Sequence, residues 1–386
     1  MKIKKNALLA VFFTILVYQS VFVSINAIYI PQYGNIKRNI LYILLLCLIP
    51  YFTLLIKKRY IKFNIVILLI VFSIMVSAKQ NEGVFVSYTT SSTVFAYQIA
   101  LFAWYCEFLD FKGQTKLAIK CIYLLSFMYC VLADILMFVD PHIFVSEWGE
   151  VSYFYLVGTK FDLCYLHFLC VILYYTLYNN KKKGCLLILW CGAIAIMSSC
   201  STMLIGTILY AIFILFSNNI RILFEKRIFG LIYLTICSVI LLVGAPLLKI
   251  PVIQYIIVDV LNESLTLTGR MNIYQKIGYI LLLNPIWGGG YDANYYLSMK
   301  MTGAADIQNG ILDIMISFGI FGIIMFIILL CFSIKSSKLI KSPAIIIGIY
   351  VYITLSSVEI TFRLSFYCLL IMIILCSWSS DRALKN

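Results

Sequence analysis

The sequence has little charge for its length. Only 12% of its 386 residues are charged and 63% are hydrophobic, whereas soluble globular proteins carry about 25% charged and 45–50% apolar residues. Such a chain cannot hide its apolar surface from water in a core of its own, so the composition predicts a protein dissolved in lipid. The net charge of +14 fits this prediction, because Lys and Arg gather in the cytoplasmic loops of membrane proteins. We therefore expect no nucleic-acid partner.

Ligands for metals and nucleotides are scarce as well. The chain has two histidines, His142 and His167, and 13 cysteines, none of which form a CxxC pair. Most of the cysteines lie in apolar runs, where buried cysteine behaves as a small hydrophobe. No Walker A loop occurs, and no GxGxxG motif is followed by an acidic residue. The sequence thus predicts no metal site, no disulfide framework and no bound cofactor.

Long apolar segments recur along the whole chain. A helix needs about 20 apolar residues to cross the hydrocarbon core of a bilayer, and about 12 segments are of that kind. The sequence therefore predicts an all-α fold, a polytopic transmembrane helical bundle that forms a single integral membrane domain over residues 1–386. The predicted spans are residues 7–30, 39–56, 61–78, 93–110, 117–139, 161–178, 184–199, 202–217, 228–248, 309–334, 342–360 and 362–380.

The basic residues are distributed unevenly between the two sides of this topology. When alternate loops are assigned to one side, the side that holds both termini carries 21 of the 30 Lys and Arg residues. This bias predicts that the N-terminus and the C-terminus are cytoplasmic. The outer side is left with nine cations: Lys37, Arg38, Lys79, Lys160, Lys249, Arg270, Lys276, Lys300 and Arg363.

One large extracytoplasmic loop, residues 249–308, separates the ninth and tenth predicted spans. It is rich in Ile, Leu, Tyr and Trp, so we expect it to fold back onto the membrane surface. Thr268 is suited to cap a helix whose first turn holds Arg270 and which ends at Asn284-Pro285. Free N–H groups at a helix start, together with a guanidinium, predict an anion site.

Two further features follow this helix. The glycines at 288–290 let the backbone turn sharply. A polar stretch then opens the tenth span and ends at Asp313, about one turn inside it. Ionisable groups within spans are costly and usually face a cavity or a partner. Gly319 and Gly322 further along this span are typical of close helix packing.

These features resemble the O-antigen polymerase and ligase superfamily over about residues 267–330. The resemblance rests on the order Thr268-Gly269-Arg270, an amphipathic helix, Asn284-Pro285-x-x-Gly288-x-Gly290-Tyr291, Gln308-Asn309-Gly310-x-Leu312 and Gly319-x-x-Gly322. Gln308-Asn309 stands where the family usually has His-Asn, which argues against the ligase branch and against an ionisable base there. Outside this region, Gly158-Thr159-Lys160-Phe161 is similar to polymerases from capsule and exopolysaccharide loci.

The resemblance implies a Wzy-type polymerase of O-antigen, capsule or exopolysaccharide synthesis in a bacterial cytoplasmic membrane. Such a glycosyltransferase moves a growing glycan from undecaprenyl pyrophosphate to the non-reducing end of a new lipid-linked repeat unit. The reaction takes place at the outer membrane face and needs neither a nucleotide sugar nor a metal. The implied partners are the lipid-linked oligosaccharide, membrane lipid, a chain-length regulator and a flippase of the same pathway.

The implied chemistry needs outer cations, because negative charge develops on the departing pyrophosphate and Arg binds phosphate in a bidentate manner. We expect Arg270 to bind the donor pyrophosphate, and Arg363 or Lys160 to bind that of the second lipid. Lys276 is a further substrate ligand. Asp313 is the expected catalytic carboxylate. The remaining candidates are Gln308, Asn309 and Glu359 as substrate ligands and, as alternative bases, Asp306, Glu359 and the more remote Asp292.

Other interpretations of these residues stay open. The helix that begins near Arg270 can be an interfacial helix whose cations contact lipid headgroups. Arg363 can be an interfacial residue paired with Glu359, and Lys160 can pair with Asp162.

Other functions stay open as well. A ligase of the same superfamily would hand the glycan to a different acceptor. A flippase or another transporter would concentrate polar groups near mid-membrane, where Asp134 is the one obvious ionisable residue.

Overall fold

The computed structural model describes residues 2–82, 86–145, 151–178, 180–239, 250–255, 258–259, 270–303 and 306–385. Almost all of them are helical. The elements are α1 (Lys2–Val21), α2 (Tyr33–Leu48), the 3-10 helix η1 (Ile49–Leu54), α3 (Ile61–Gln80), α4 (Val86–Lys112), α5 (Thr115–Val139), β1 (His142–Val145), β2 (Val151–Phe154), α6 (Lys160–Leu177), α7 (Lys181–Met197), α8 (Ser201–Leu215), α9 (Ser217–Phe224), α10 (Arg227–Val239), α11 (Pro251–Tyr255), α12 (Arg270–Leu283), α13 (Ala293–Thr302), α14 (Gly310–Ser337), α15 (Ala344–Leu355) and α16 (Leu364–Lys385).

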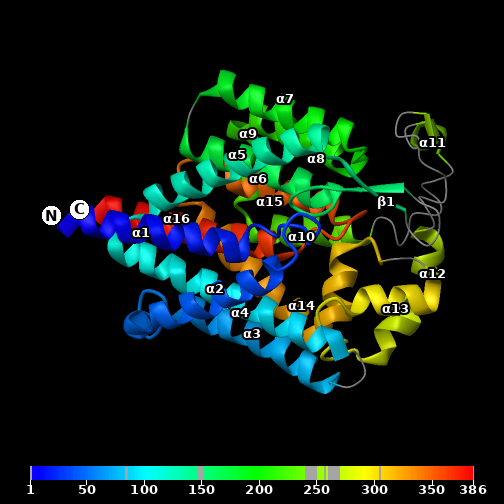
Figure 1. Cartoon of the computed structure of the whole chain (residues 1–386), viewed down its shortest axis with the longest axis horizontal. Coiled ribbons are helices and arrows are strands. Elements are labelled where there is room, and N and C mark those ends of the chain that lie inside the picture. The colour runs from blue at the N-terminus through cyan, green and yellow to red at the C-terminus, as the bar shows by residue number, and fades with distance from the viewer. Residues whose placement is uncertain are drawn as a thin grey trace.

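The helices form an elongated bundle with both termini at one end (Figure 1). The other end carries the antiparallel pair β1–β2, in which His142 lies opposite Phe154, and the short helices α11 to α13 (Figure 1). The described helices between α10 and α14 therefore lie at the end remote from the termini (Figure 1).

Six helices in the described part of the chain are long and apolar enough to cross a membrane, and they indicate a membrane-embedded protein. They are α2 with η1, α3, α5, α6, α14 and α16. Helices α8 and α9 pass the same test together, although they are bent by 100° at their junction. All twelve predicted segments overlap a helix, while the number that cross the bilayer stays a prediction.

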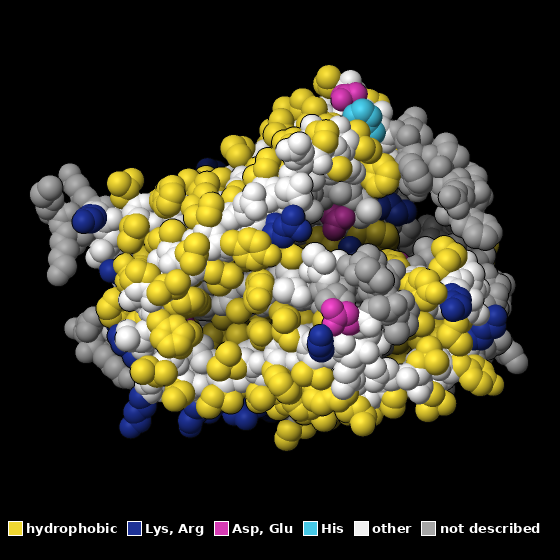
Figure 2. Space-filling view, turned by 60° about the horizontal axis from the view of Figure 1, so that its bottom comes forward, with side chains coloured by type: hydrophobic (Ala, Val, Ile, Leu, Met, Phe, Trp, Pro, Cys, Tyr) yellow, Lys and Arg dark blue, Asp and Glu magenta, His cyan; other side chains and the backbone are white. Residues whose placement is uncertain are grey.

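The bundle is apolar outside as well as inside. Leu46 of α2, Leu68 of α3 and Phe138 of α5 are 65%, 64% and 64% exposed, and hydrophobic side chains cover most of the face in Figure 2. Such a surface suits lipid rather than water. In the interior, α15 is almost wholly buried and packs against α6, α8, α10 and α16.

At the end of the bundle that carries both termini, a buried carboxylate links α4 to α16 and to the segment before α3. Asp110 of α4 lies 3.1 Å from Arg59 Nε and 3.1 Å from Arg382 Nη2, and the Tyr60 hydroxyl donates to it at 2.6 Å. Glu107, nearly one turn earlier in α4, is also fully buried. Both carboxyl groups lie in the last turn of the predicted span 93–110, so the expectation that Asp134 is the one obvious ionisable residue near mid-membrane stays a prediction.

The helix predicted within the large loop is present. It runs over Arg270–Leu283 and ends directly before the Asn-Pro pair at 284–285, because proline lacks the N–H that continues a helix. Ile277 and Ile280 are buried against α13 and α14, whereas Lys276 is exposed. These residues confirm the predicted apolar and polar faces.

Helix α14 is broken at Gly319, which has φ +64°. The turn that follows α12 fills the break with its own backbone. Gly289 N donates to Ile316 O at 2.6 Å, and Ile320 N donates to Pro285 O at 2.9 Å. The sequence predicted close helix packing at Gly319, but the glycine admits a loop backbone into a broken helix instead.

Candidate functional site

A cavity of about 490 Å³ lies at the end of the bundle remote from the termini. It is bounded by the end of α1, the first halves of α2, α4 and α6, the turn before α13 and the start of α16. Ligand sites commonly measure about 300–1,000 Å³, so the cavity has the size of one. Its polar lining consists of Ser24, Lys37, Thr90, Ser91, Gln98, Asp162, Tyr165, Tyr291, Asp292, Arg363 and Ser365.

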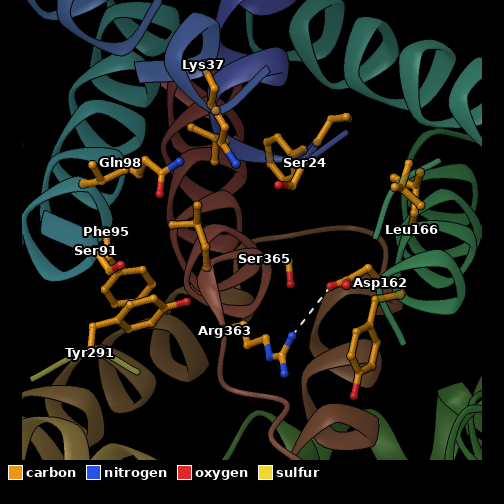
Figure 3. A pocket seen from close by; sticks show the side chains of 18 of the residues that line it. Ser24, Lys37, Ser91, Phe95, Gln98, Asp162, Leu166, Tyr291, Arg363 and Ser365 are labelled. Atoms are coloured by element: carbon orange, nitrogen blue, oxygen red, sulfur yellow. Dashed lines mark ion pairs between the residues drawn. The ribbon is translucent and has the colours of Figure 1, made fainter. Parts of the chain in front are cut away.

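Arg363 enters this cavity from the link between α15 and α16. Its Nη2 donates to the hydroxyl of Tyr295 on α13 at 2.9 Å, and its Nη1 lies 3.7 Å from Asp162 Oδ1 on α6 (Figure 3). The side chain is 31% exposed. Two helices therefore hold the guanidinium while part of it stays open to the cavity.

The start of α6 fixes the position of Asp162. Its Oδ2 accepts hydrogen bonds from Thr159 N at 2.9 Å and Thr159 Oγ1 at 2.8 Å, and the two residues form a capping box. Gly158 has φ +115°, and a Cβ there would lie 2.6 Å from the same Oδ2. The Gly-Thr sequence therefore leaves room for the carboxylate and holds it toward Arg363.

A second cation and a tyrosine also line the cavity. Lys37 on the second turn of α2 points into it (Figure 3). Tyr165 of α6 borders it as well and is 7% exposed. The Tyr165 hydroxyl is itself buried and has no hydrogen-bond partner among the described residues, so Lys37 is the polar group that these two residues present to the cavity.

The turn after α12, which contains the glycines at 288–290, contributes the next two residues to the cavity wall. Tyr291 stacks on Phe95 of α4 with ring centroids 4.3 Å apart, and its N–H donates to Ser92 Oγ at 2.9 Å. Asp292 follows with φ +66°. Burial raises the pKa of Asp292 to about 6, and the nearby Arg363 opposes that shift. The turn thus presents a half-buried carboxyl group to the cavity.

Of the cations predicted to bind substrate whose side chains are described, Arg363 alone lines this cavity. Lys160 Nζ donates to Ser199 O at 3.1 Å, and Lys276 Nζ donates to Met301 O at 3.1 Å on the exposed side of α12. The side chain of Arg270 and the whole of Thr268 lie outside the described residues. The expected anion site at the start of α12 therefore stays a prediction.

The ion pairs expected as alternatives are wrong. Asp162 pairs with Arg363 rather than with Lys160. Arg363 in turn pairs with Asp162 rather than with Glu359, which is 4% exposed and accepts a hydrogen bond from Ile360 N at 3.1 Å. The cavity therefore draws its ion pair from two segments that lie far apart in the sequence.

The Gln-Asn pair before α14 has a structural role. Asn309 is fully buried. Its Oδ1 accepts from Ile311 N and Leu312 N, and its Nδ2 donates to Ser238 O and Ser357 O. These bonds cap α14 and engage both polar atoms of the amide. Gln308 has φ +52°, and its carbonyl accepts from the Tyr274 hydroxyl at 3.2 Å.

Of the carboxylates predicted as catalytic groups, Asp292 alone borders the cavity. Asp313 is in the first turn of α14 and Glu359 is in the link after α15, and neither borders the cavity. Their roles in catalysis and substrate binding stay predictions. The carboxylates that do line the cavity in the described part of the chain are Asp162 and Asp292.

Sequence reasoning missed several residues of this site. Lys37 was one of nine outer cations and lies in no motif, and Tyr165 was one of 28 tyrosines. Asp162 did carry a signal, because Thr-x-x-Asp before an apolar run is a capping pattern. Asp292 was not missed, because the sequence analysis names it as the more remote alternative base; it directly follows the Gly-x-Gly-Tyr motif.

Comparisons of the chain with protein-family models, with curated proteins and with solved structures found no match. A function for the site is therefore argued from its own geometry together with the motifs between residues 267 and 330.

Proposed function

We propose that this protein is a Wzy-type polymerase of undecaprenyl-pyrophosphate-linked repeat units, with its reaction centre in the Arg363 cavity. The observation that carries the proposal is the pair of cations, Arg363 and Lys37, in one cavity with the turn formed by the Asn-Pro-x-x-Gly-x-Gly-Tyr motif. The motif resembles the polymerase and ligase superfamily, and its tyrosine and the next residue form part of the cavity wall.

The charges of the cavity suit a pyrophosphate leaving group. Cleavage of the bond between the sugar and the phosphate leaves extra negative charge on the departing oxygen, and fixed cations stabilise that charge. Arg363 offers a planar guanidinium held by Asp162 and Tyr295. Lys37 supplies a compact charge on a flexible stem. Two cations of different shape in one cavity can hold both phosphates of one lipid headgroup.

The remaining lining groups suit a sugar. Gln98 and Ser91 contribute polar groups to the wall (Figure 3). Hydroxyls and amides of this kind bind sugar hydroxyls through hydrogen bonds. The ring of Tyr291, held by its stacking on the buried Phe95, adds an apolar surface for a sugar ring.

The proposal also fixes an orientation in the bacterial cytoplasmic membrane. Both termini lie at the end remote from the cavity (Figure 1), and the larger share of the basic residues belongs to the loops on the side of the termini. Cytoplasmic termini therefore place the cavity at the outer leaflet, where the repeat units are joined. A chain-length regulator and a flippase are the partners proposed for the pathway.

The test is the size profile of the lipid-linked glycan in a strain that lacks the gene, with the membrane side of the repeat unit probed. We expect a single repeat unit on the outer leaflet and no ladder of longer products. Re-expression of the wild-type gene should restore the ladder.

The other outcomes of the same test identify a different function. A normal lipid-linked ladder would rule out the polymerase, and loss of surface attachment alone would indicate a ligase. A single repeat unit trapped on the inner leaflet would indicate a flippase.

A further inference from the structure

The residue at the start of α13 has a side chain that does not cap the helix. Asp292 is the N-cap residue of α13, and Asp is among the strongest N-cap residues. Its side chain nevertheless makes no capping hydrogen bond. It borders the cavity instead. A helix cap is worth about 0.5–2 kcal/mol, so the arrangement forgoes local stability for a carboxyl group in the cavity.

The backbone of Asp292 is constrained as well. Its φ of +66° lies in the left-handed region, which is uncommon for residues other than glycine. Gly290 N donates to Ser317 O at 2.9 Å and Tyr291 N donates to Ser92 Oγ at 2.9 Å. These bonds anchor the turn on α14 and α4. Residues held in this region by their surroundings cluster at functional sites.

We propose that Asp292 is the general base that accepts the proton of the acceptor sugar hydroxyl. This inference rests on the proposed function and names a residue for it. The acceptor oxygen forms a bond to the anomeric carbon of the donor glycan. The bond between that carbon and the pyrophosphate oxygen breaks, and the pyrophosphate leaves with the electron pair. The hydroxyl proton passes to a carboxylate oxygen of Asp292 and then to water.

The other carboxylate of the cavity has a different task. Asp162 uses Oδ2 to accept two hydrogen bonds from Thr159, and its Oδ1 faces Arg363. Both of its oxygens are therefore engaged in positioning the cation. Two carboxyl groups in one site whose surroundings differ in this way commonly divide into a positioning or charge-stabilising group and a proton-transfer group.

The surroundings of Asp292 suit proton transfer. A general base works best when its pKa is near the working pH, and burial raises the pKa of Asp292 to about 6. Because the carboxylate must be ionised to accept a proton, activity is present above that pKa and is lost as the pH falls below it. We expect the rate to fall about tenfold for each pH unit below about 6.

The experiment uses the full-length protein in proteoliposomes with its lipid-linked repeat unit as substrate. Asp292→Asn keeps the size of the side chain and suits the same left-handed backbone. We expect its polymerisation rate to fall by about 10²–10⁴-fold, while binding of the repeat unit changes less than twofold. The residual rate should no longer fall at acidic pH. Asp292→Glu should recover part of the rate. Glu82→Gln, on the outer surface away from the cavity, is the matched control.

The outcomes separate this inference from the proposed function. If the wild-type protein makes no polymer from the repeat unit, the proposed function fails and the inference fails with it. If the wild-type protein polymerises, and Asp292→Asn does so at the same rate and with the same loss of rate at acidic pH, the assignment of the base alone is overturned. The assignment of the base would also be overturned if Asp292→Asn lost binding of the repeat unit but kept the loss of rate at acidic pH.

Discussion

Arg363 Nη1 lies 3.7 Å from Asp162 Oδ1. The pair joins the link before the last helix to the first turn of α6, in the wall of the cavity of about 490 Å³. The carboxylate is fixed by Thr159 and the guanidinium also by Tyr295. The cation is therefore already in place before any ligand arrives, and preorganised charge of this kind is what stabilises a developing anion.

Replacement of Arg363 tests the cation. Loss of one preorganised donor typically costs about 10²–10³-fold in rate. We expect Arg363→Ala to lose polymer formation by at least that factor, and Arg363→Lys to recover only part of it because an ammonium cannot bind phosphate in a bidentate manner. The readout is polymer length and amount per expressed protein. Arg38→Ala removes an outer arginine that does not line the cavity, and it should make normal polymer. A full-length ladder from Arg363→Ala would eliminate this residue from the site.

Two substitutions of Asp162 separate its role in orienting Arg363 from its role in the stability of the fold. Asp162→Ala removes the capping oxygen from α6, and we expect about 0.5–2 kcal/mol less stability, visible as a lower melting temperature. Asp162→Asn keeps an oxygen that can accept from Thr159 but removes the charge that faces Arg363. It should melt near the wild-type temperature and still polymerise more slowly. Equal activity of Asp162→Asn and the wild type would show that the ion pair has no role in orienting Arg363.

Gly319 and Gly278 are the test position and the control position for the role of glycine at the break in α14. A Cβ on Gly319 would collide with the carbonyl of Ile286, and its φ of +64° is unfavourable for other residues. We expect Gly319→Ala to lower stability by at least about 1–3 kcal/mol. Gly278 in α12 has nothing within 4 Å of an added Cβ, so Gly278→Ala should be neutral or stabilising by up to about 1 kcal/mol. Melting temperature in detergent is the measurement, and similar values for the two variants would contradict this account of the break.

A buried polar contact joins α5 and α6. His167 Nε2 of α6 is 3.2 Å from Asp134 Oδ1 of α5, and Trp190 Nε1 donates to Asp134 Oδ2 at 2.8 Å. Removal of one partner leaves a buried polar group unsatisfied, which costs about 1–3 kcal/mol. We therefore expect His167→Phe and Asp134→Leu each to lower the melting temperature. The double variant should regain part of the loss, because neither side chain is then left without its partner. Additive losses in the double variant would show that the two residues do not form an energetically coupled pair.

Local features of the sequence predicted the helices well. The apolar runs are long enough that each overlaps a helix, and the C-terminal end of α12 followed from Pro285, which stops the helix. Signals of this type depend on near neighbours in the chain. They need no knowledge of how the helices pack.

The cavity could not be derived in the same way. Its wall combines residues of five helices with the turn before α13, and their meeting depends on packing. The motifs drew attention to Asn309, which proves to be a buried cap of α14. They also led past Asp292, which seemed remote because it lies well before Asp313 in the sequence. Only the stacking of the glycine turn on α4 brings it to Arg363.

The break in α14 also sets an order of assembly during biosynthesis. The amide groups of Gly289 and Gly290 take their partners from Ile316 and Ser317, which the ribosome makes later. The glycine turn is therefore synthesised with these bonds unmade, and they form only when α14 has been made and packs beside it. A chain truncated before α14 would keep that turn permanently unfinished, which gives membrane quality-control proteases a simple difference between complete and incomplete copies.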